Sequence, residues 1–507
     1  MSVAILRSRA QIGTTAPPVT IEVFLSGGLP AFSVVGMPET AVRESKDRVR
    51  GALLSSEFRF PLERIIVSLG PADMRKSGGR FDLAIALGIL VASKQVPAAL
   101  LDSFEFYGEL ALNGALRPVP GVLCAALKAD ADARNIIVPR ENAAEAALVS
   151  ERVHAAGSLL DVCAHFRRVQ AITPALRVEP EPAAAEVPDI ADVRGQRHAK
   201  YALEVAAAGG HNLLFVGPPG TGKSMLAARL PGILPPMSKE EALETAAIDS
   251  VLGMPFNAKR WRLRPFRAPH HTASAPALVG GGSDPRPGEV SRAHNGVLFL
   301  DELPEFSRHV LEVLREPLES GQITISRARR QNDFPAAFQL VAAMNPCPCG
   351  YLGDLRGDCA CSAERVRAYR SRISGPLLDR IDLQVEVGRP APELLRGPSP
   401  AAETSREVQQ RVAAAHALQL HRQGTSNARL AGKLLARHCE LDVRGWQMLD
   451  DAADKFALSV RSYQRILRVS RTIADLAGTA AIRADQLAAA LAMRGLAVTK
   501  PGQGDAR

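Results

Sequence analysis

The sequence predicts an α/β fold with a central parallel sheet, preceded by a mixed α+β region and followed by a helical region. Three observations predict it. Between about residues 190 and 390, apolar strand-like runs alternate with helical stretches, which favours a parallel sheet. The first 170 residues mix short β-like runs with helical ones. From about 404 to 497 the chain is rich in Ala, Leu, Arg and Gln and has little glycine.

Size and composition limit the classes of protein to consider. A chain of 507 residues is too long for one core and predicts about three domains. The 46% hydrophobic and 23% charged content is that of a globular protein. No apolar run reaches the roughly 18 residues of a membrane span, and the N-terminus lacks the apolar core of a signal peptide. We therefore expect a cytoplasmic protein with no membrane partner.

The charge balance points toward a partner. The formal net charge is +9, which favours a polyanion because lysines and arginines displace counterions from nucleic-acid phosphates. The alternative is an ordinary solvated surface. Arg327, Arg329 and Arg330, which follow the strand-like QITIS, are candidates for phosphate contacts, and a solvated turn is the alternative there.

Strand and helix patterns place the domain boundaries. In the N-terminal domain, residues 1–172, we expect three strands and one buried helix: Ile21–Leu25, Ile65–Leu69, Ile136–Pro139 and Phe81–Ala92. Residues 173–190 carry four prolines with little apolar content, which is typical of a linker. A core over 191–395 contains expected strands at His211–Val216, Gly296–Leu300 and Gln339–Ala343. Residues 404–497 form the helical domain.

A phosphate-binding loop stands between the strand NLLFV and a helix. Its sequence, GPPGTGKS, has the spacing G-x-x-x-x-G-K-S in the context that this motif requires. The glycines let the backbone amides point at an anion, and the following helix adds its positive end. The loop predicts ATP as a cofactor, bound by Gly217, Pro218, Pro219, Gly220, Thr221, Gly222, Lys223 and Ser224.

Two carboxylates follow the buried strand VLFL. Asp301 and Glu302 lie where open α/β sheets bind ligands, at the carboxyl end of a strand. We expect Asp301 and the Ser224 hydroxyl to hold Mg²⁺, and Glu302 to polarise the attacking water.

Two further polar residues are candidates for catalysis. Asn345 ends the strand FQLVAAM, where its amide would lie between a γ-phosphate and water; a strand-terminating turn is the alternative. Arg380, in LLDRIDL, is flanked by Asp379 and Asp382. It is either a surface ion-pair residue or a finger that reaches a neighbouring subunit's nucleotide.

The order of these elements resembles that of AAA+ ATPases. Longer stretches resemble the magnesium-chelatase-like group and, within it, the YifB/ComM family: FRAPHHTAS, LVGGG, PGEVSRAHNGVLFLDELPEF and AAMNPCPCG. The resemblance covers nearly the whole chain. It identifies the loop at 217–224 as Walker A, Asp301–Glu302 as Walker B, Asn345 as sensor 1 and Arg380 as the trans-acting arginine finger. Arg461 corresponds to the sensor 2 arginine of the helical lid.

The resemblance also implies an activity. Similarity to this family implies a ring hexamer that drives branch migration of DNA during natural transformation. We therefore expect a homohexameric ATPase acting on single-stranded or branched DNA. The alternative is a chelatase-type motor that remodels a protein partner or drives metal insertion. A chelatase motor subunit would not be expected to carry this N-terminal domain.

The N-terminal domain resembles the Lon-protease fold. Residues 108–129 have its rhythm, and 75–90 align with its active-site loop. The position of the nucleophilic serine falls on Arg80, and that of the partner lysine on Leu123. Without a hydroxyl and a base there is no nucleophilic catalysis, so we expect a domain without protease activity.

Four cysteines form a compact pattern, C-x-C-x9-C-x-C. Thiolates of Cys347, Cys349, Cys359 and Cys361 suit tetrahedral Zn²⁺, although C-x-C is one residue shorter than the usual C-x-x-C. Reduced free thiols are the alternative. For His270 and His271 we favour loop hydrogen bonding or a role near the nucleotide over metal binding.

Overall fold

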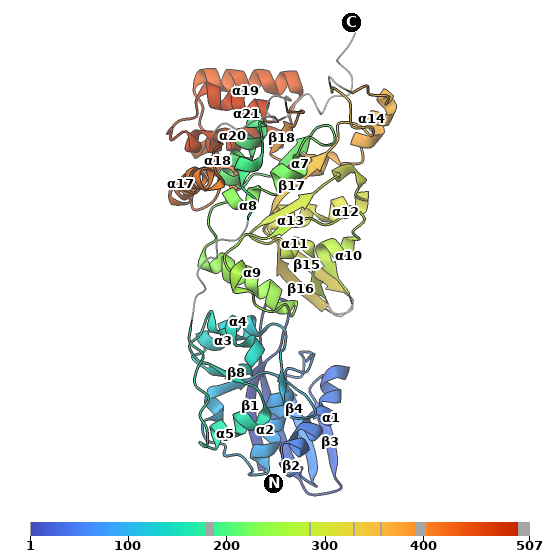
Figure 1. Cartoon of the computed structure of the whole chain (residues 1–507), viewed down its shortest axis with the longest axis vertical. Helices are drawn as coiled ribbons and strands as arrows, with labels where there is room; N and C mark the ends of the chain where they lie inside the picture. The colour runs from blue at the N-terminus through green and yellow to red at the C-terminus, as the bar shows by residue number, and fades with distance from the viewer. Residues whose placement is uncertain are drawn as a thin grey trace. The chain divides into compact units, whose positions relative to one another are not determined.

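The computed structural model describes residues 2–177, 187–282, 285–327, 330–354, 357–390 and 402–494. The chain divides into two compact units. One comprises Met1–Ala183 with Ala242–Trp261, and the other Ala184–Glu241 with Arg262–Arg507 (Figure 1). This division differs from the expected boundaries in two respects: residues 242–261 group with the N-terminal residues, and the expected core and helical domain fall in one unit. Part of the expected linker, 178–186, lies outside the described residues.

The N-terminal unit is built on a seven-stranded mixed sheet in the order β3-β4-β2-β1-β5-β8-β9. These strands are β1 (Ser2–Arg9), β2 (Pro18–Ser26), β3 (Ala31–Val35), β4 (Arg64–Gly70), β5 (Phe104–Phe106), β8 (Asn135–Pro139) and β9 (Val153–Ala156). A small hairpin joins β6 (Glu109–Leu110) and β7 (Leu116–Arg117). The helices are α1 (Thr40–Ser55), α2 (Asp82–Ala92), α3 (Val122–Ala131), α4 (Ala143–Ala147) and α5 (Leu159–Phe166).

Helix α2, apolar in every residue after Asp82, forms the centre of this unit. Ten of its eleven residues are buried, and it packs against β1 and β2. The three expected strands and the expected helix of this region are all present. The match to the Lon-protease fold stays a prediction.

A segment from the middle of the chain completes the N-terminal unit. Helix α9 (Lys239–Val251) contributes its residues from 242 onward. The Ser250 carbonyl accepts a hydrogen bond from the Gly121 amide at 2.8 Å, and its hydroxyl accepts one from the Leu123 amide at 3.3 Å. The segment therefore lies at the start of α3, beside the position that the Lon resemblance assigns to a catalytic lysine.

The second unit contains a five-stranded parallel sheet in the order β11-β14-β17-β10-β18. These strands are β10 (Leu213–Val216), β11 (Phe266–Arg267), β14 (Val297–Leu300), β17 (Gln339–Met344) and β18 (Leu383–Glu386). Strands β10, β14 and β17 are buried along their whole length, which explains their near-continuous apolar sequences. The sheet confirms the predicted parallel α/β core.

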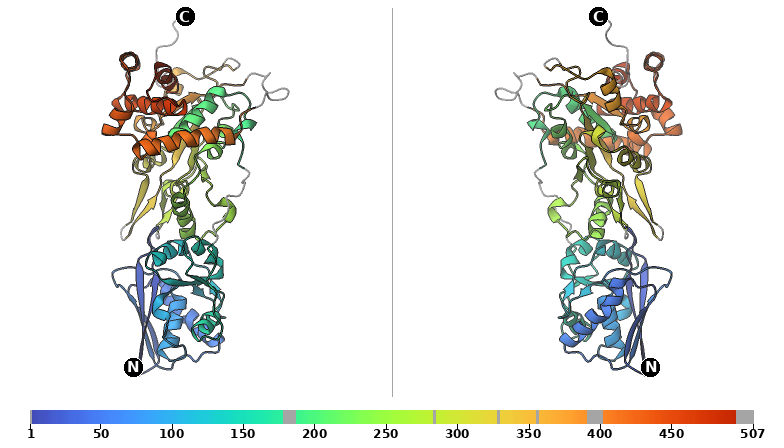
Figure 2. Two further views of the ribbon diagram at one scale, coloured as in Figure 1. Left: turned by 90° about the vertical axis from the view of Figure 1, so that its left-hand side faces the viewer. Right: turned by 90° about the vertical axis from the view of Figure 1, so that its right-hand side faces the viewer.

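Short helices and two hairpins surround this sheet. The helices are α6 (Arg197–Gly209), α7 (Lys223–Ala227), α8 (Leu230–Ile233), α10 (Ala275–Val279), α11 (Glu289–Arg292), α12 (Arg308–Val313), α13 (Arg315–Ser320), α14 (Ala363–Arg370) and α15 (Gly375–Leu378). The hairpins are β12 (Gly280–Gly281) with β13 (Arg286–Pro287), and β15 (Gln322–Arg327) with β16 (Arg330–Pro335). The β15–β16 hairpin, in yellow, extends away from the sheet (Figure 2).

The C-terminal region is helical, as predicted. It contains α17 (Ser405–Gln423), α18 (Gly432–His438), α19 (Val443–Phe456), α20 (Val460–Leu476) and α21 (Ala484–Ala492). Helix α17 begins at a capping box formed by Thr404 and Glu407. Helices α17 and α20 pack against α6, so the helical domain shares one core with the sheet. None of the described helices combines the length and apolarity needed to cross a membrane.

Candidate nucleotide site and its surroundings

The phosphate-binding loop follows β10 at the carboxyl edge of the sheet and leads directly into α7. Two of its glycines are required by geometry. A Cβ on Gly217 would lie 2.1 Å from the Val387 carbonyl oxygen, so the loop passes too close to the neighbouring chain for any side chain. Gly222 has a φ of +90°, which favours glycine, and a Cβ there would meet nothing within 4 Å. The loop thus leaves open space on its outer side.

Lys223 lies inside the curl of this loop. Its ammonium donates to the carbonyl oxygens of Gly217 at 2.7 Å and Pro218 at 2.9 Å. Burial lowers the pKa of Lys223, and the carboxylates of Asp301 and Glu302 oppose that shift. The cation is therefore held by weak neutral acceptors that an anionic phosphate would outcompete.

Ser224 and Asp301, the two predicted magnesium ligands, are hydrogen-bonded to each other. The Ser224 hydroxyl donates to a carboxylate oxygen of Asp301 at 2.6 Å. A hydroxyl and a carboxylate are the hard oxygen ligands that Mg²⁺ prefers, alongside waters and substrate phosphates. The residues present therefore fit a magnesium–nucleotide complex.

Glu302 follows Asp301 in a strained backbone conformation. Its φ of 52° and ψ of 46° are left-handed, which few residues other than glycine adopt. Such strain clusters at functional sites. The carboxylate lies 3.3 Å from Nδ1 of His271, measured from Oε2.

The contact of His271 with Glu302 was not predicted from the sequence. His271 comes from the chain after β11, the strand that pairs with β14, and its ring lies against that of His270, with the centroids 4.1 Å apart and the planes tilted by 33°. Nδ1 of His270 instead bonds the Thr272 hydroxyl, at 2.8 Å. The double histidine after Pro269 was the only sequence signal, and it did not indicate which carboxylate would be the partner.

Asn345 contacts the phosphate site directly. Its side-chain oxygen accepts a hydrogen bond from the Lys223 ammonium at 3.1 Å. This places a polar amide from the end of β17 beside the phosphate-binding loop that follows β10. A role in catalysis stays a prediction.

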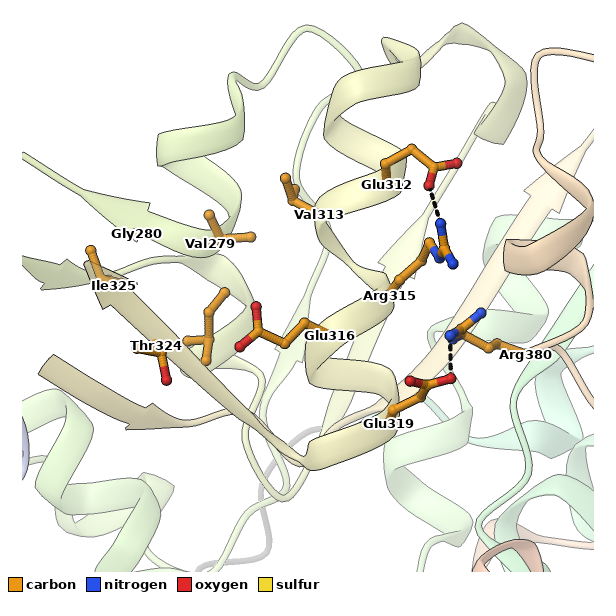
Figure 3. A pocket seen from close by; sticks show the side chains of 11 residues that line it. Val279, Gly280, Glu312, Val313, Arg315, Glu316, Glu319, Thr324, Ile325 and Arg380 are labelled. Atoms are coloured by element: carbon orange, nitrogen blue, oxygen red, sulfur yellow. Dashed lines mark hydrogen bonds and ion pairs between the residues drawn. The ribbon is translucent and has the colours of Figure 1, made fainter. Parts of the chain in front are cut away.

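Arg380 lies apart from these groups. Its side chain is 7% exposed and donates to the Pro376 carbonyl oxygen at 2.6 Å and to the Glu319 carboxylate. With Arg315, Glu312, Glu316 and Glu319 it lines a pocket of about 510 Å³ (Figure 3). The residues lining this pocket include none of the phosphate loop or its acidic pair. Its ion-pair partner is thus Glu319 rather than a sequence neighbour.

Two arginines of α20, Arg461 and Arg465, interact with the segment that carries Arg380. Arg465 forms an ion pair with one carboxylate oxygen of Asp382, and the other oxygen lies 3.5 Å from Nδ1 of His211. The partners of Asp382 hold its pKa well below its usual range despite complete burial. Arg461 is close enough to Arg380 to help lower the pKa of that guanidinium, although burial is the largest cause. The predicted arginine finger, Arg380, and the predicted sensor 2 arginine, Arg461, thus interact electrostatically.

The four predicted cysteines come together. Their sulfur atoms all lie within 4.8 Å of one another. Of the basic cluster, Arg327 and Arg330 are backbone partners in the register of the β15–β16 hairpin, and Arg329 lies outside the described residues.

In the N-terminal unit, Arg80 occupies the position expected for a serine nucleophile. It is buried, and its guanidinium donates to the carbonyl oxygens of Arg9, at 3.2 Å, and Pro120. Burial lowers the pKa of Arg80. Leu123 is also buried. Neither side chain supplies a nucleophile or a base.

A Walker-type loop, a strand-end acidic pair and a five-stranded parallel sheet in which β10 lies between β17 and β18, together with a helical domain, define a P-loop ATPase of the AAA+ class. Three profiles of the magnesium chelatase family match this chain: subunit ChlI of Mg-chelatase over residues 21–142, magnesium chelatase subunit ChlI over 189–394, and the ChlI C-terminal profile over 402–494. The chain belongs to the YifB/ComM family of magnesium-chelatase-like AAA+ proteins.

Three relatives illustrate the range of similarity. YifB of Salmonella typhimurium is 51% identical over 94% of this chain and 94% of its own length. Competence protein ComM of Haemophilus influenzae is 50% identical over 98% of each chain. The magnesium-chelatase 38 kDa subunit of Rhodobacter capsulatus is 29% identical over 39% of this chain and 55% of its own length.

Proposed function

We propose that this protein is a cytoplasmic, homohexameric ATPase that moves single-stranded or branched DNA, as a translocase or branch-migration helicase in recombination or natural transformation. The observation that carries the proposal is the nucleotide site, in which Lys223, Ser224, Asp301, Glu302 and Asn345 lie together. Similarity over 98% of its length to a protein named for competence, together with a net charge of +9, favours DNA as the substrate.

In this proposal each residue has one role. The loop 217–224 cradles the phosphates of ATP, and Lys223 exchanges its carbonyl acceptors for phosphate oxygens. Ser224 and Asp301 hold Mg²⁺, which neutralises charge that develops on the transferred phosphoryl group. Glu302 orients and polarises the attacking water, and Asn345 holds the water or the γ-phosphate.

The proposed ring rests on Arg380. This side chain lines a pocket whose residues include none of its own nucleotide site, and in this proposal it would reach the nucleotide of a neighbouring subunit. A head-to-tail contact repeated by rotation closes into a ring. Arg461, which interacts electrostatically with Arg380, would act as the sensor 2 arginine of the helical lid.

The experiment that tests this function measures ATP turnover of the full chain with single-stranded, duplex and forked DNA, and strand exchange on a four-way junction. We expect stimulation by branched or single-stranded DNA and strand movement that stops in Glu302→Gln. Turnover that no DNA changes, with no strand movement, would exclude a DNA motor. Arg329→Ala with Arg330→Ala should weaken DNA binding and reduce its salt dependence, because phosphate contacts release counterions.

A second candidate is a chelatase-type motor, favoured by the match of all three chain segments to magnesium chelatase profiles. It predicts that a partner protein, and not DNA, stimulates ATP turnover. Comparing the two stimulations on one preparation separates the candidates.

A further inference from the structure

The loop between β17 and α14 gathers more cysteine than the rest of the chain combined. Four of the seven cysteines lie between residues 347 and 361, whereas the other three, Cys124, Cys163 and Cys439, are buried singly. Within the described part of this loop there is no helix or strand between Asn345 and Ser362. A connection of this length without regular structure needs another source of order.

The sulfur positions discriminate between the states that four cysteines can adopt. Cys347 Sγ lies 3.3 Å from Cys349 Sγ and 3.7 Å from Cys359 Sγ, and the last two sulfurs are 3.6 Å apart. A disulfide requires about 2.05 Å, so these pairs are not bonded. Four thiolates around zinc, each about 2.3 Å from the ion, place their sulfurs about 3.8 Å from one another. The observed separations are close to that value.

Accessibility also suits a metal. Cys347 is buried, and Cys349, Cys359 and Cys361 are partly exposed, so an ion can enter from one side. No other group of three or more potential ligands of this kind occurs among the described residues. The cysteines of two C-x-C pairs, which have nine residues between them, thus converge on one point.

We propose that Cys347, Cys349, Cys359 and Cys361 hold one structural Zn²⁺, and that this centre fixes sensor 1 against the phosphate-binding loop. Cys347 stands two residues after Asn345, whose amide oxygen contacts Lys223 at 3.1 Å. The backbone at Gly350 also packs on the phosphate-binding loop. A Cβ at Gly350 would lie 2.7 Å from Cδ of Pro219 and 3.8 Å from Cγ of Asn345.

Two further contacts anchor the cysteine-containing loop. The Arg370 guanidinium, on α14, donates to the Pro346 carbonyl oxygen at 3.2 Å, and Asp354 pairs with Arg389 at 3.0 Å. The zinc centre therefore ties together the start and end of a loop that touches both Pro219 and Asn345. Its effect on catalysis rests on the proposed ATPase function, whereas zinc binding itself does not.

The test measures zinc in the full chain purified without chelator. We expect about one zinc per chain, and visible cobalt–thiolate absorption after exchange with Co²⁺. Cys361→Ser should lose zinc, and Cys361→His should retain it because imidazole is also a zinc ligand. Cys163→Ala, a buried cysteine of the other unit, is the control and should keep the metal. A folded wild type with no zinc, freely reactive thiols and no cobalt–thiolate band overturns the centre, as does unchanged zinc in Cys361→Ser.

Catalysis is measured on the same variants. A displacement of about 1 Å at a catalytic group costs up to about 100-fold in rate, so Cys361→Ser should lower turnover about 10- to 100-fold while Cys361→His restores most of it. Loss of zinc with wild-type turnover would overturn the link to sensor 1. A wild type that holds zinc but hydrolyses no ATP would instead count against the proposed function alone.

Discussion

Lys223 and Arg80 are both buried cations that donate to backbone carbonyls, yet their surroundings differ. Lys223 has Asp301, Glu302 and Asn345 around it, and Gly220 and Gly222 of its loop face open space. Arg80 is enclosed by the Arg9 and Pro120 carbonyls, with the Gln11 amide oxygen 3.5 Å away. Burial lowers the pKa of both groups. Burial of a cation therefore does not by itself indicate a functional site. The indication at Lys223 comes from the neighbouring acidic pair and from the open space beside the loop backbone.

The largest expected effect lies in the nucleotide-binding unit, at Arg380. Arg380→Ala should bind ATP normally and hydrolyse it about 10³–10⁵-fold more slowly, because a finger supplied in trans stabilises transition-state charge. Turnover and nucleotide affinity measured on one preparation check this. Arg152→Ala is the control: it removes an exposed ion pair with Asp130 in the other unit and should leave turnover unchanged.

Mixing separates a finger from a structural role. Arg380→Ala mixed with Lys223→Ala should regain part of the turnover, because one subunit keeps its nucleotide site and the other supplies its guanidinium. A mixture that co-assembles and stays inactive, or normal hydrolysis by Arg380→Ala alone, would return Arg380 to the role of a partner for Glu319.

Glu302 should give the next largest effect. Glu302→Gln should still bind ATP but hydrolyse it about 10²–10⁴-fold more slowly, because only the water-polarising group is lost. Lys223→Ala should instead lose nucleotide affinity. Glu305→Gln is a matched control: this residue lies three positions on and pairs with Arg372 at the surface. Wild-type hydrolysis by Glu302→Gln would contradict the assignment of this carboxylate.

Arg80 should affect stability rather than catalysis. Arg80→Met leaves the buried carbonyls of Arg9 and Pro120 without their donor, which should cost about 1–3 kcal/mol of unfolding free energy. Denaturation of wild type and variant measures it, and ATP turnover of the folded variant should be unchanged. The wild type should release no peptides from unfolded substrates with ATP. Proteolysis that disappears in Ser77→Ala would show that this unit has a working nucleophile.

The sequence predicts some features well because a short contiguous segment determines them. The eight residues of the phosphate loop contain everything that its backbone geometry requires, and the apolar runs before Gly217, Asp301 and Asn345 are buried parallel strands. Their meeting at one sheet edge follows from strand direction alone.

Other features depend on residues far apart in the chain. The partner of Arg380 is Glu319, 61 positions away, although Asp379 and Asp382 are its sequence neighbours. Packing of residues 242–261 with the N-terminal unit follows from tertiary contacts at Ser250, which no local pattern encodes. The cysteine spacing indicated a shared site, but only the fold shows that its loop lies against Pro219.

The smallest expected effect concerns His271, because this residue orients the Glu302 carboxylate and is not itself a reacting group. One imidazole nitrogen lies 3.3 Å from one oxygen of the Glu302 carboxylate, which leaves the other oxygen for water. Both side chains are partly exposed, and such a pair contributes about 0.2–1 kcal/mol, so His271→Ala should lower kcat no more than about five-fold, with KM unchanged. His271→Gln can still donate a hydrogen bond and should restore much of the rate. His270→Ala is the matched control, because that ring bonds Thr272 and not Glu302. A higher kcat in His271→Ala would mean that the imidazole restrains Glu302, and an equal loss in His270→Ala would mean that the stacked pair only supports the loop.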